Sequence, residues 1–135
     1  MRFPLAQRYS DYDAKQHVNN AVYLTYFEMA RARAWLDALG GTSANLPFIV
    51  AEATVRYVSE ARLGDPLDIA IWTDGVRTKS WVWRYRMYDS RDDRLVAEGN
   101  TVQVMYDYEG RRTIAIPEEL RERLAAMREP DARDR

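Results

Sequence analysis

The chain has 135 residues, 47% of them hydrophobic and 30% charged, with a formal net charge of −1 and no cysteine. This suits one domain, residues 1–135, around one core, and it excludes a disulfide framework, a thiolate nucleophile and a cysteine-based zinc site. With no basic excess, no N-terminal apolar run of signal-peptide length and no stretch of about 20 apolar residues, we expect a cytoplasmic protein with no membrane span and no nucleic-acid partner.

The first predicted element is a short edge strand at residues 5–10, where the pattern alternates loosely behind Pro4. A long helix follows in "NAVYLTYFEMARARAWLDALGG", residues 20–41, whose apolar positions recur at steps of three and four and form one wide face. Asn19 or Asn20 is the expected N-cap, and the Gly-Gly pair at its end stops the helix.

After a loop that ends near Pro47, the hydrophobic pattern changes to period two, which predicts successive antiparallel strands. These strands are "FIVAEATVRYVS" (48–59), "LDIAIWT" (67–73), "SWVWRYRMYD" (80–89), "LVAEGNTVQVMYD" (95–107) and a short one from Ile114 to Ile116. Pro117 opens a short amphipathic helix, and we expect a frayed tail from about residue 129.

This order of elements predicts an α+β fold, in which a curved antiparallel sheet wraps around one long central helix. Such a sheet has open edges. Pairing of one edge with a second copy of the chain would cover it, so we expect a homo-oligomer.

The stretch "SDYDAKQHVNN", residues 10–20, lies at the mouth of the long helix and contains the only histidine. A carboxylate such as Asp13 beside a helix N-terminus suits attack on an acyl carbonyl, because the free first-turn amides can hold the developing oxyanion. Asp11 lies two residues away and would share the side of Asp13 if the strand extended that far.

Other interpretations of this stretch remain open from the residues alone. The aspartates and asparagines are common turn and cap residues, and a single histidine near a cap is often structural. A metal site is also conceivable, but Lys15 interrupts the pattern and no second histidine or cysteine completes a zinc site. A phosphatase-type Asp-x-Asp nucleophile needs a buried apolar strand before it, and "LAQRYS" is too polar.

The segment "YSDYDAKQHVNNAVYLTYFEMARARAW", residues 9–35, resembles the signature of hotdog-fold acyl-CoA thioesterases of the 4-hydroxybenzoyl-CoA thioesterase-like family. The matching elements are Tyr9-x-Asp11-x-Asp13, "HVNN" at 17–20 and "YFEMAR" at 26–31. The resemblance continues through "RLGDPLDIAIWT" and the later strands to "IPEEL", so it covers nearly the whole chain.

The resemblance implies a hotdog fold and a role for each matching residue. Asp13 corresponds to the catalytic aspartate, as nucleophile or general base, and the backbone N–H of Asn20 to the amide that polarises the thioester carbonyl. His17 and Asn19 lie within the same motif, so His17 is a third candidate catalytic residue and Asn19 a candidate substrate-binding residue. Glu28 corresponds to the helix glutamate, which we expect to be structural and buried with a polar partner.

One residue departs from the family pattern. Gln16 stands where the family usually has glycine, a residue that allows close backbone approach or a positive φ angle. We therefore expect Gln16 either to narrow the thioester slot or to mark a different loop path.

The implied function is hydrolysis of acyl-CoA to free acid and coenzyme A, without a metal or redox cofactor, by a homodimer or homotetramer with sites between subunits. Basic and polar residues near turns are candidates for binding the coenzyme A phosphates; they are Arg62, Arg77, Lys79, Ser80, Arg111 and Arg112. Trp81 and Trp83 are core residues or line an acyl tunnel.

Two other functions are compatible with the same sequence. One is an acyl-CoA-binding protein without turnover, and the other is a hydratase or dehydratase on the same fold, for which His17 is the sole histidine available. Fold alone does not decide among these functions, and the sequence leaves the acyl group open.

Overall fold

A computed structural model describes residues 1–41 and 47–131 of the chain. The elements in chain order are β1 (Arg2–Pro4), the 3-10 helix η1 (Tyr9–Asp11), α1 (Val22–Asp37), β2 (Phe48–Tyr57), β3 (Leu67–Val76), β4 (Ser80–Asp89), β5 (Arg94–Asp107), β6 (Arg112–Thr113) and α2 (Glu118–Ala126). The predicted loop before Pro47 lies largely outside the described residues, as do residues 132–135 of the tail.

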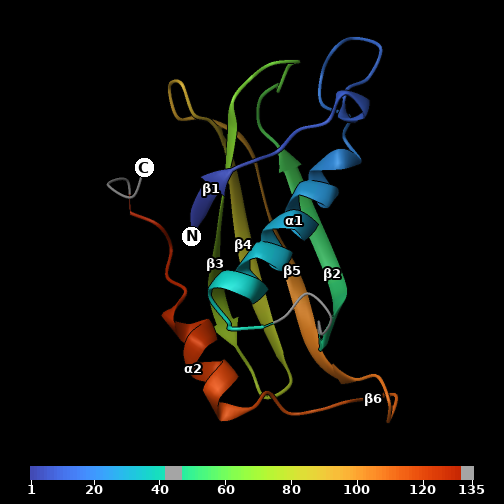
Figure 1. Ribbon diagram of the computed structural model, residues 1–135, viewed down its shortest axis with the longest axis vertical. Coiled ribbons are helices and arrows are strands. Elements are labelled where there is room, and N and C mark those ends of the chain that lie inside the picture. The colour runs from blue at the N-terminus through green and yellow to red at the C-terminus, as the bar shows by residue number, and fades with distance from the viewer. Residues whose placement is uncertain (42–46, 132–135) are drawn as a thin grey trace.

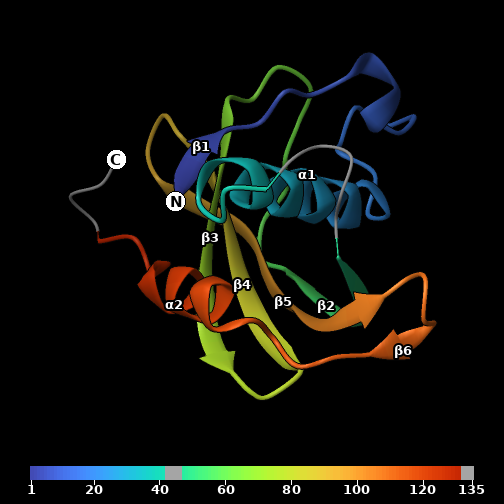
Figure 2. The same ribbon diagram turned by 60° about the horizontal axis from the view of Figure 1, so that its bottom comes forward.

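The strands form an antiparallel sheet in the order β1-β3-β4-β5-β2, and β6 pairs with β5 beyond this path. Figures 1 and 2 show α1 lying across one face of the sheet, which curves beneath it. The predicted α+β architecture of a curved antiparallel sheet and a central helix is therefore confirmed. No helix within residues 1–41 and 47–131 is long and apolar enough to cross a membrane.

The core lies between α1 and the inner face of the sheet. The apolar stripe of α1 is buried as predicted, and β4 alternates so that its large side chains face inward; the buried set includes Tyr26, Phe27, Ala30, Ala34, Trp81, Trp83, Tyr85 and Met87. Phe27 stacks on Tyr85 with 4.2 Å between ring centroids. A Cβ at Gly99 would come within 2.7 Å of the Phe27 ring, so glycine at this position of β5 lets the helix approach closely.

The inner face of β5 is partly polar. Thr101 and Gln103 are fully buried opposite Trp83 and Trp81, whereas Val102 and Val104 lie on the outer face. The buried polar groups are hydrogen-bonded, since the Thr101 hydroxyl lies 2.6 Å from that of Tyr85 and the Gln103 amide donates to the Thr101 carbonyl at 3.2 Å.

The N-terminal strand is shorter and earlier than predicted. The prediction placed it at residues 5–10, but β1 ends at Pro4 and residues 9–11 form η1. The Asp11 carboxylate explains the change, because it accepts the Arg8 N–H at 2.8 Å and bends the chain into a turn. The predicted edge position is confirmed, since β1 pairs with β3 alone.

The other helix and strand boundaries differ modestly from the predictions. The helix α1 spans 16 residues, from Val22 to Asp37, and the Gly41 N–H caps the Trp35 carbonyl at 2.8 Å. The last strand lies at Arg112–Thr113 rather than from Ile114 to Ile116. Ile114 still donates its N–H to Met105 of β5, but Ile116 donates to Thr78, as the chain crosses toward α2. In the tail, Glu129 forms an ion pair with Arg86.

Candidate active site

The loop before α1 is a tight hairpin at one end of the sheet. Tyr12 and Val18 form an isolated β-bridge, and the Asp13 N–H donates to the His17 carbonyl at 2.8 Å. The Asp13 carboxylate accepts the N–H groups of Lys15 at 2.9 Å and His17 at 3.2 Å through one oxygen, Oδ1. Asp13 is thus a turn residue, and its other oxygen accepts no hydrogen bond from the described residues.

The backbone conformation at Gln16 bears on the path of the loop, where the family usually has glycine. Its φ angle is +61°, so it adopts the left-handed conformation that favours glycine. The loop therefore keeps a glycine-type path with a larger residue in it. The Gln16 side chain is exposed, and its carbonyl accepts the Leu63 N–H at 2.8 Å, which ties the hairpin to the connection between β2 and β3.

The two asparagines at the start of α1 have different environments. The Asn19 side chain accepts the Ala21 N–H at 3.0 Å, and its carbonyl accepts the Val22 N–H at 2.9 Å, so Asn19 closes the turn that leads into the helix. The N-cap itself is Ala21, without a side-chain capping bond, so the expectation of Asn19 or Asn20 at that position is wrong. The Asn20 carbonyl accepts the Tyr57 hydroxyl at 2.9 Å. Among the described residues no hydrogen bond uses the Asn20 N–H, which leaves one amide available at the positive end of the helix dipole.

A pocket of about 280 Å³ brings the three predicted catalytic residues together. It is lined by Asp13, His17, Val18, Asn20, Tyr23, Tyr57, Val58, Ser59, Glu60 and Ala61. The His17 imidazole Nε2 lies 3.5 Å from a Glu60 carboxylate oxygen. Residues with a carboxylate, an imidazole and an unbonded backbone amide thus line one cavity, and groups of these kinds serve as bases, acids and oxyanion donors in acyl transfer.

The second wall of this pocket was not predicted from the sequence. Tyr57 and Glu60 come from the end of β2 and the turn that follows, and Tyr57 packs edge-on against Tyr23 with 5.0 Å between centroids. These residues lie far from the motif in the chain, and the antiparallel bridge between His17 and Arg62, with the backbone hydrogen bonds beside it, brings them to it. No local pattern signals that pairing.

Asp11 does not share the pocket with Asp13. Its side chain is 1% exposed and accepts the Tyr26 hydroxyl at 3.0 Å and the Arg8 guanidinium at 2.9 Å. Burial alone would raise the pKa of the Asp11 carboxyl, but hydrogen bonds from the Arg8 backbone, Tyr26 and the Arg8 side chain outweigh burial and lower that pKa below its ordinary value.

The remaining predicted binding residues lie at two opposite ends of the folded molecule. Arg62 lies beside the pocket, where its guanidinium pairs with Glu60 at 3.2 Å. Arg77 and Lys79 lie in the turn between β3 and β4, and Ser80 begins β4, at the end that carries α2 and is opposite the hairpin (Figure 1).

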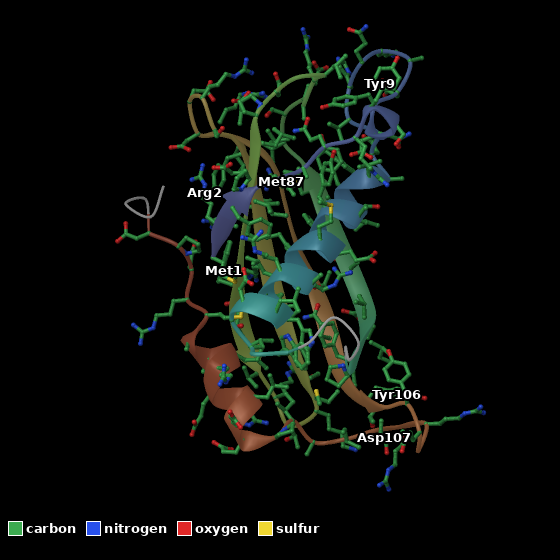
Figure 3. The ribbon with its side chains drawn as sticks, in the orientation of Figure 1. Met1, Arg2, Tyr9, Met87, Tyr106 and Asp107 are labelled. Carbon is green, nitrogen blue, oxygen red and sulfur yellow. The ribbon has the colours of Figure 1, made fainter. Side chains whose placement is uncertain are left out.

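In Figure 3, the label Tyr9 lies at the hairpin end, and the labels Tyr106 and Asp107 lie at the opposite end. Arg112 in β6 lies opposite Asp107 of β5 in the strand pairing, so Arg112 and its neighbour Arg111 are also at the far end. One chain therefore does not bring this second group of residues to Asp13.

Two further expectations can be compared with the structure. Glu28 is exposed on α1 rather than buried with a polar partner, so that expectation is wrong for the single chain, because the apolar stripe turns this helix position outward. Trp81 and Trp83 are core residues, each at most 1% exposed. The described part of the chain contains no cluster of three histidine, cysteine, aspartate or glutamate side chains that could hold a metal ion.

The family model of the thioesterase-like superfamily matches residues 8–124. The chain belongs to this superfamily. The resemblance found in the sequence is thereby confirmed at the level of the family, and the match extends from just before the hairpin to α2.

This thioesterase-like chain is similar to named enzymes over most of its length. It is 31% identical over 122 residues to the long-chain acyl-CoA thioesterase FadM of Escherichia coli strain K12, covering 85% of this chain and 89% of FadM. It is 28% identical over 123 residues to the acyl-CoA thioester hydrolase YbgC of E. coli O6:H1, covering 88% of this chain and 91% of YbgC.

Among solved structures, a thioesterase of Thermus thermophilus in complex with coenzyme A and zinc has a TM-score of 0.83 to this chain. The two are 31% identical, and the alignment covers 93% of this chain and 92% of the Thermus protein. The predicted hotdog fold is therefore confirmed.

The left-handed Gln16 gives a first prediction. A non-glycine residue in this conformation costs roughly 1–2 kcal/mol, and glycine loses roughly 0.5–1 kcal/mol more backbone entropy on folding. Gln16→Gly should therefore raise the free energy of unfolding, by about 0.5–1 kcal/mol, in urea denaturation. Lys15→Gly is the control, because Lys15 has no positive φ, and it should lower stability. Equal effects of the two changes would contradict this interpretation.

The buried Asp11 carboxylate gives a second prediction. Above about pH 5 the carboxyl is ionised in the folded and unfolded states, and its stabilising contribution is complete. As the pH falls further, the unfolded chain takes up the proton first, so the contribution shrinks and is lost below the lowered pKa of the folded state.

Asp11→Asn should therefore be less stable than the wild type at pH 7, and the difference should narrow as the pH approaches 3. Urea denaturation across this range measures it. A difference that stays constant from pH 7 to pH 3 would show that the Asp11 charge does not contribute.

Proposed function

We propose that the protein hydrolyses acyl-CoA thioesters to a free acid and coenzyme A. The observation that carries this proposal is the pocket at the start of α1, where the Asp13 carboxylate and the unbonded Asn20 amide line one cavity in a member of the thioesterase-like superfamily. The similarity to FadM and YbgC supports an acyl-CoA as the substrate.

Each pocket residue has a proposed role. The Asn20 N–H, aided by the helix dipole, binds the thioester carbonyl oxygen and stabilises the oxyanion that forms. Asp13 either takes a proton from the attacking water or attacks the carbonyl carbon itself, giving an anhydride that water then opens. The carbon–sulfur bond breaks, and the thiolate of coenzyme A takes up a proton, for which His17 in the pocket lining is the proposed donor. No metal or redox group takes part in this scheme.

We also propose that the active unit is a homodimer or homotetramer in the cytoplasm, joined through β2. This strand ends the sheet order, and most of its residues are exposed, including Ile49 and Val50. An open, apolar strand edge favours pairing with the same edge of a second chain. A partner could bring Arg77, Lys79 and Ser80 to the coenzyme A phosphates near Arg62, which one chain alone does not do.

Thiol release tests the proposed activity. A panel of short-chain, long-chain and aromatic acyl-CoA esters, followed with a thiol-detecting dye, should show hydrolysis by the wild type. Asp13→Asn should lower kcat by a factor of about 100 or more and keep a native circular dichroism spectrum, because Asp13 is exposed. Asp37→Asn, an exposed change further along α1, should retain the wild-type rate.

The alternatives give different results in the same assay. Tight acyl-CoA binding without thiol release would indicate a binding protein, and a change in the acyl group with the thioester intact would indicate a hydratase or dehydratase. An undiminished rate in Asp13→Asn would refute the role of Asp13.

Light scattering after gel filtration tests the proposed β2 interface. The wild type should have the mass of two or four chains, and Val50→Arg should shift it toward a single chain, because the charge would be buried without a partner. Leu36→Arg is the matched control, since Leu36 is an aliphatic residue exposed to a similar extent but lies in α1, outside β2. A wild type that runs as one chain would overturn the oligomer proposal.

A further inference from the structure

Asp11 is a buried carboxylate at the neck of the active-site hairpin, and the proposed reaction does not use it directly. Its side chain is 1% exposed. One oxygen accepts the Arg8 N–H at 2.8 Å and the Tyr26 hydroxyl at 3.0 Å, and the other accepts the Arg8 guanidinium at 2.9 and 3.0 Å. The carboxylate therefore joins the segment before the hairpin to the second turn of α1.

The backbone of Asp11 makes the complementary connection. Its carbonyl accepts the Asn19 N–H at 2.8 Å, so the residues that enter and leave the hairpin are tied at this point. Asp13 follows two residues later on one side of this tie, and Asn20 follows Asn19 on the other. A shift of Asp11 would therefore move the carboxylate and the amide of the pocket relative to each other.

All partners of this side chain are hydrogen-bond donors, so the site requires a group that only accepts, which a carboxylate is and an amide is not. An asparagine has the same shape, but its NH₂ group would face either the Arg8 guanidinium or the pair formed by the Arg8 N–H and the Tyr26 hydroxyl. Either orientation brings donor against donor, and a buried donor without an acceptor is costly. The amide would also remove the partner of the Arg8 charge.

We propose that Asp11 is a positioning residue, whose contacts with Arg8, Tyr26 and Asn19 hold Asp13 and the Asn20 amide at the spacing that thioester attack requires. This inference rests on the proposed function. Because Asp11 lies outside the pocket lining, its loss should reduce turnover with little effect on substrate binding. Displacement of reacting groups by about 1 Å can cost about 100-fold in rate.

The test compares Asp11→Asn with the wild type by steady-state kinetics and by amide hydrogen exchange. We expect kcat to fall about tenfold or more with KM within about twofold, and exchange of residues 12–20 to quicken. Tyr26→Phe should give a smaller fall, because it removes only the tie to α1 and keeps the pairing with Arg8.

A control separates positioning from general stability. Leu124→Ala removes a fully buried side chain in α2, at the opposite end of the molecule, and should cost about 2–5 kcal/mol of stability. At a temperature where all variants are folded, its kcat and its exchange over residues 12–20 should match the wild type.

Two results would overturn the inference. One is an unchanged kcat in folded Asp11→Asn, and the other is an equal loss of kcat in Leu124→Ala. If the wild type releases no thiol, the proposed function fails, and hydrogen exchange alone decides whether Asp11 positions the hairpin; unchanged protection of residues 12–20 would then reject it.

Discussion

The packing of α1 against the aromatic inner face of the sheet determines where the rest of the molecule lies. Phe27 stacks on Tyr85, and Gly99 removes the Cβ that would keep the helix away from β5. Burial of these large rings is the main apolar contribution in this region. Because the helix is held at this depth, its N-terminal end lies beside the end of β2, and Asn20 lines a pocket there instead of packing in the core.

Much of the fold could be predicted from hydrophobic periodicity. The stripe on α1 and the alternation in β4 are strong because their buried positions are large and apolar. The N-terminal strand was misplaced because one side chain, Asp11, captures the backbone of Arg8, and periodicity carries no information about that contact. The polar inner face of β5, with Thr101 and Gln103, was equally invisible, since its hydrogen-bond partners come from β4 and from the backbone.

Some residues of the candidate site could be predicted from the sequence, and others could not. Asp13, His17 and Asn20 were found because they lie within one short motif, and local turn chemistry places them around one pocket. Tyr57 and Glu60 were missed because they reach the pocket only through the pairing of the hairpin with the connection after β2. The turn interpretation of Asp13 is confirmed, because one carboxylate oxygen accepts the N–H groups of Lys15 and His17. The catalytic interpretation stays a proposal, with which the second oxygen is compatible, since it accepts no hydrogen bond from the described residues.

The bridge from Gln16 and Val18 to Leu63 and Ala61 also bears on how the chain folds. Strands β3, β4 and β5 are neighbours in sequence and can pair through short connections. The hydrogen bonds between the hairpin and the connection after β2 instead join segments separated by the whole of α1 and β2. Closing so long a stretch carries an entropic cost that is recovered only after the sheet exists. The hairpin that carries Asp13 is therefore expected to form late in folding, and to open first in a destabilised variant.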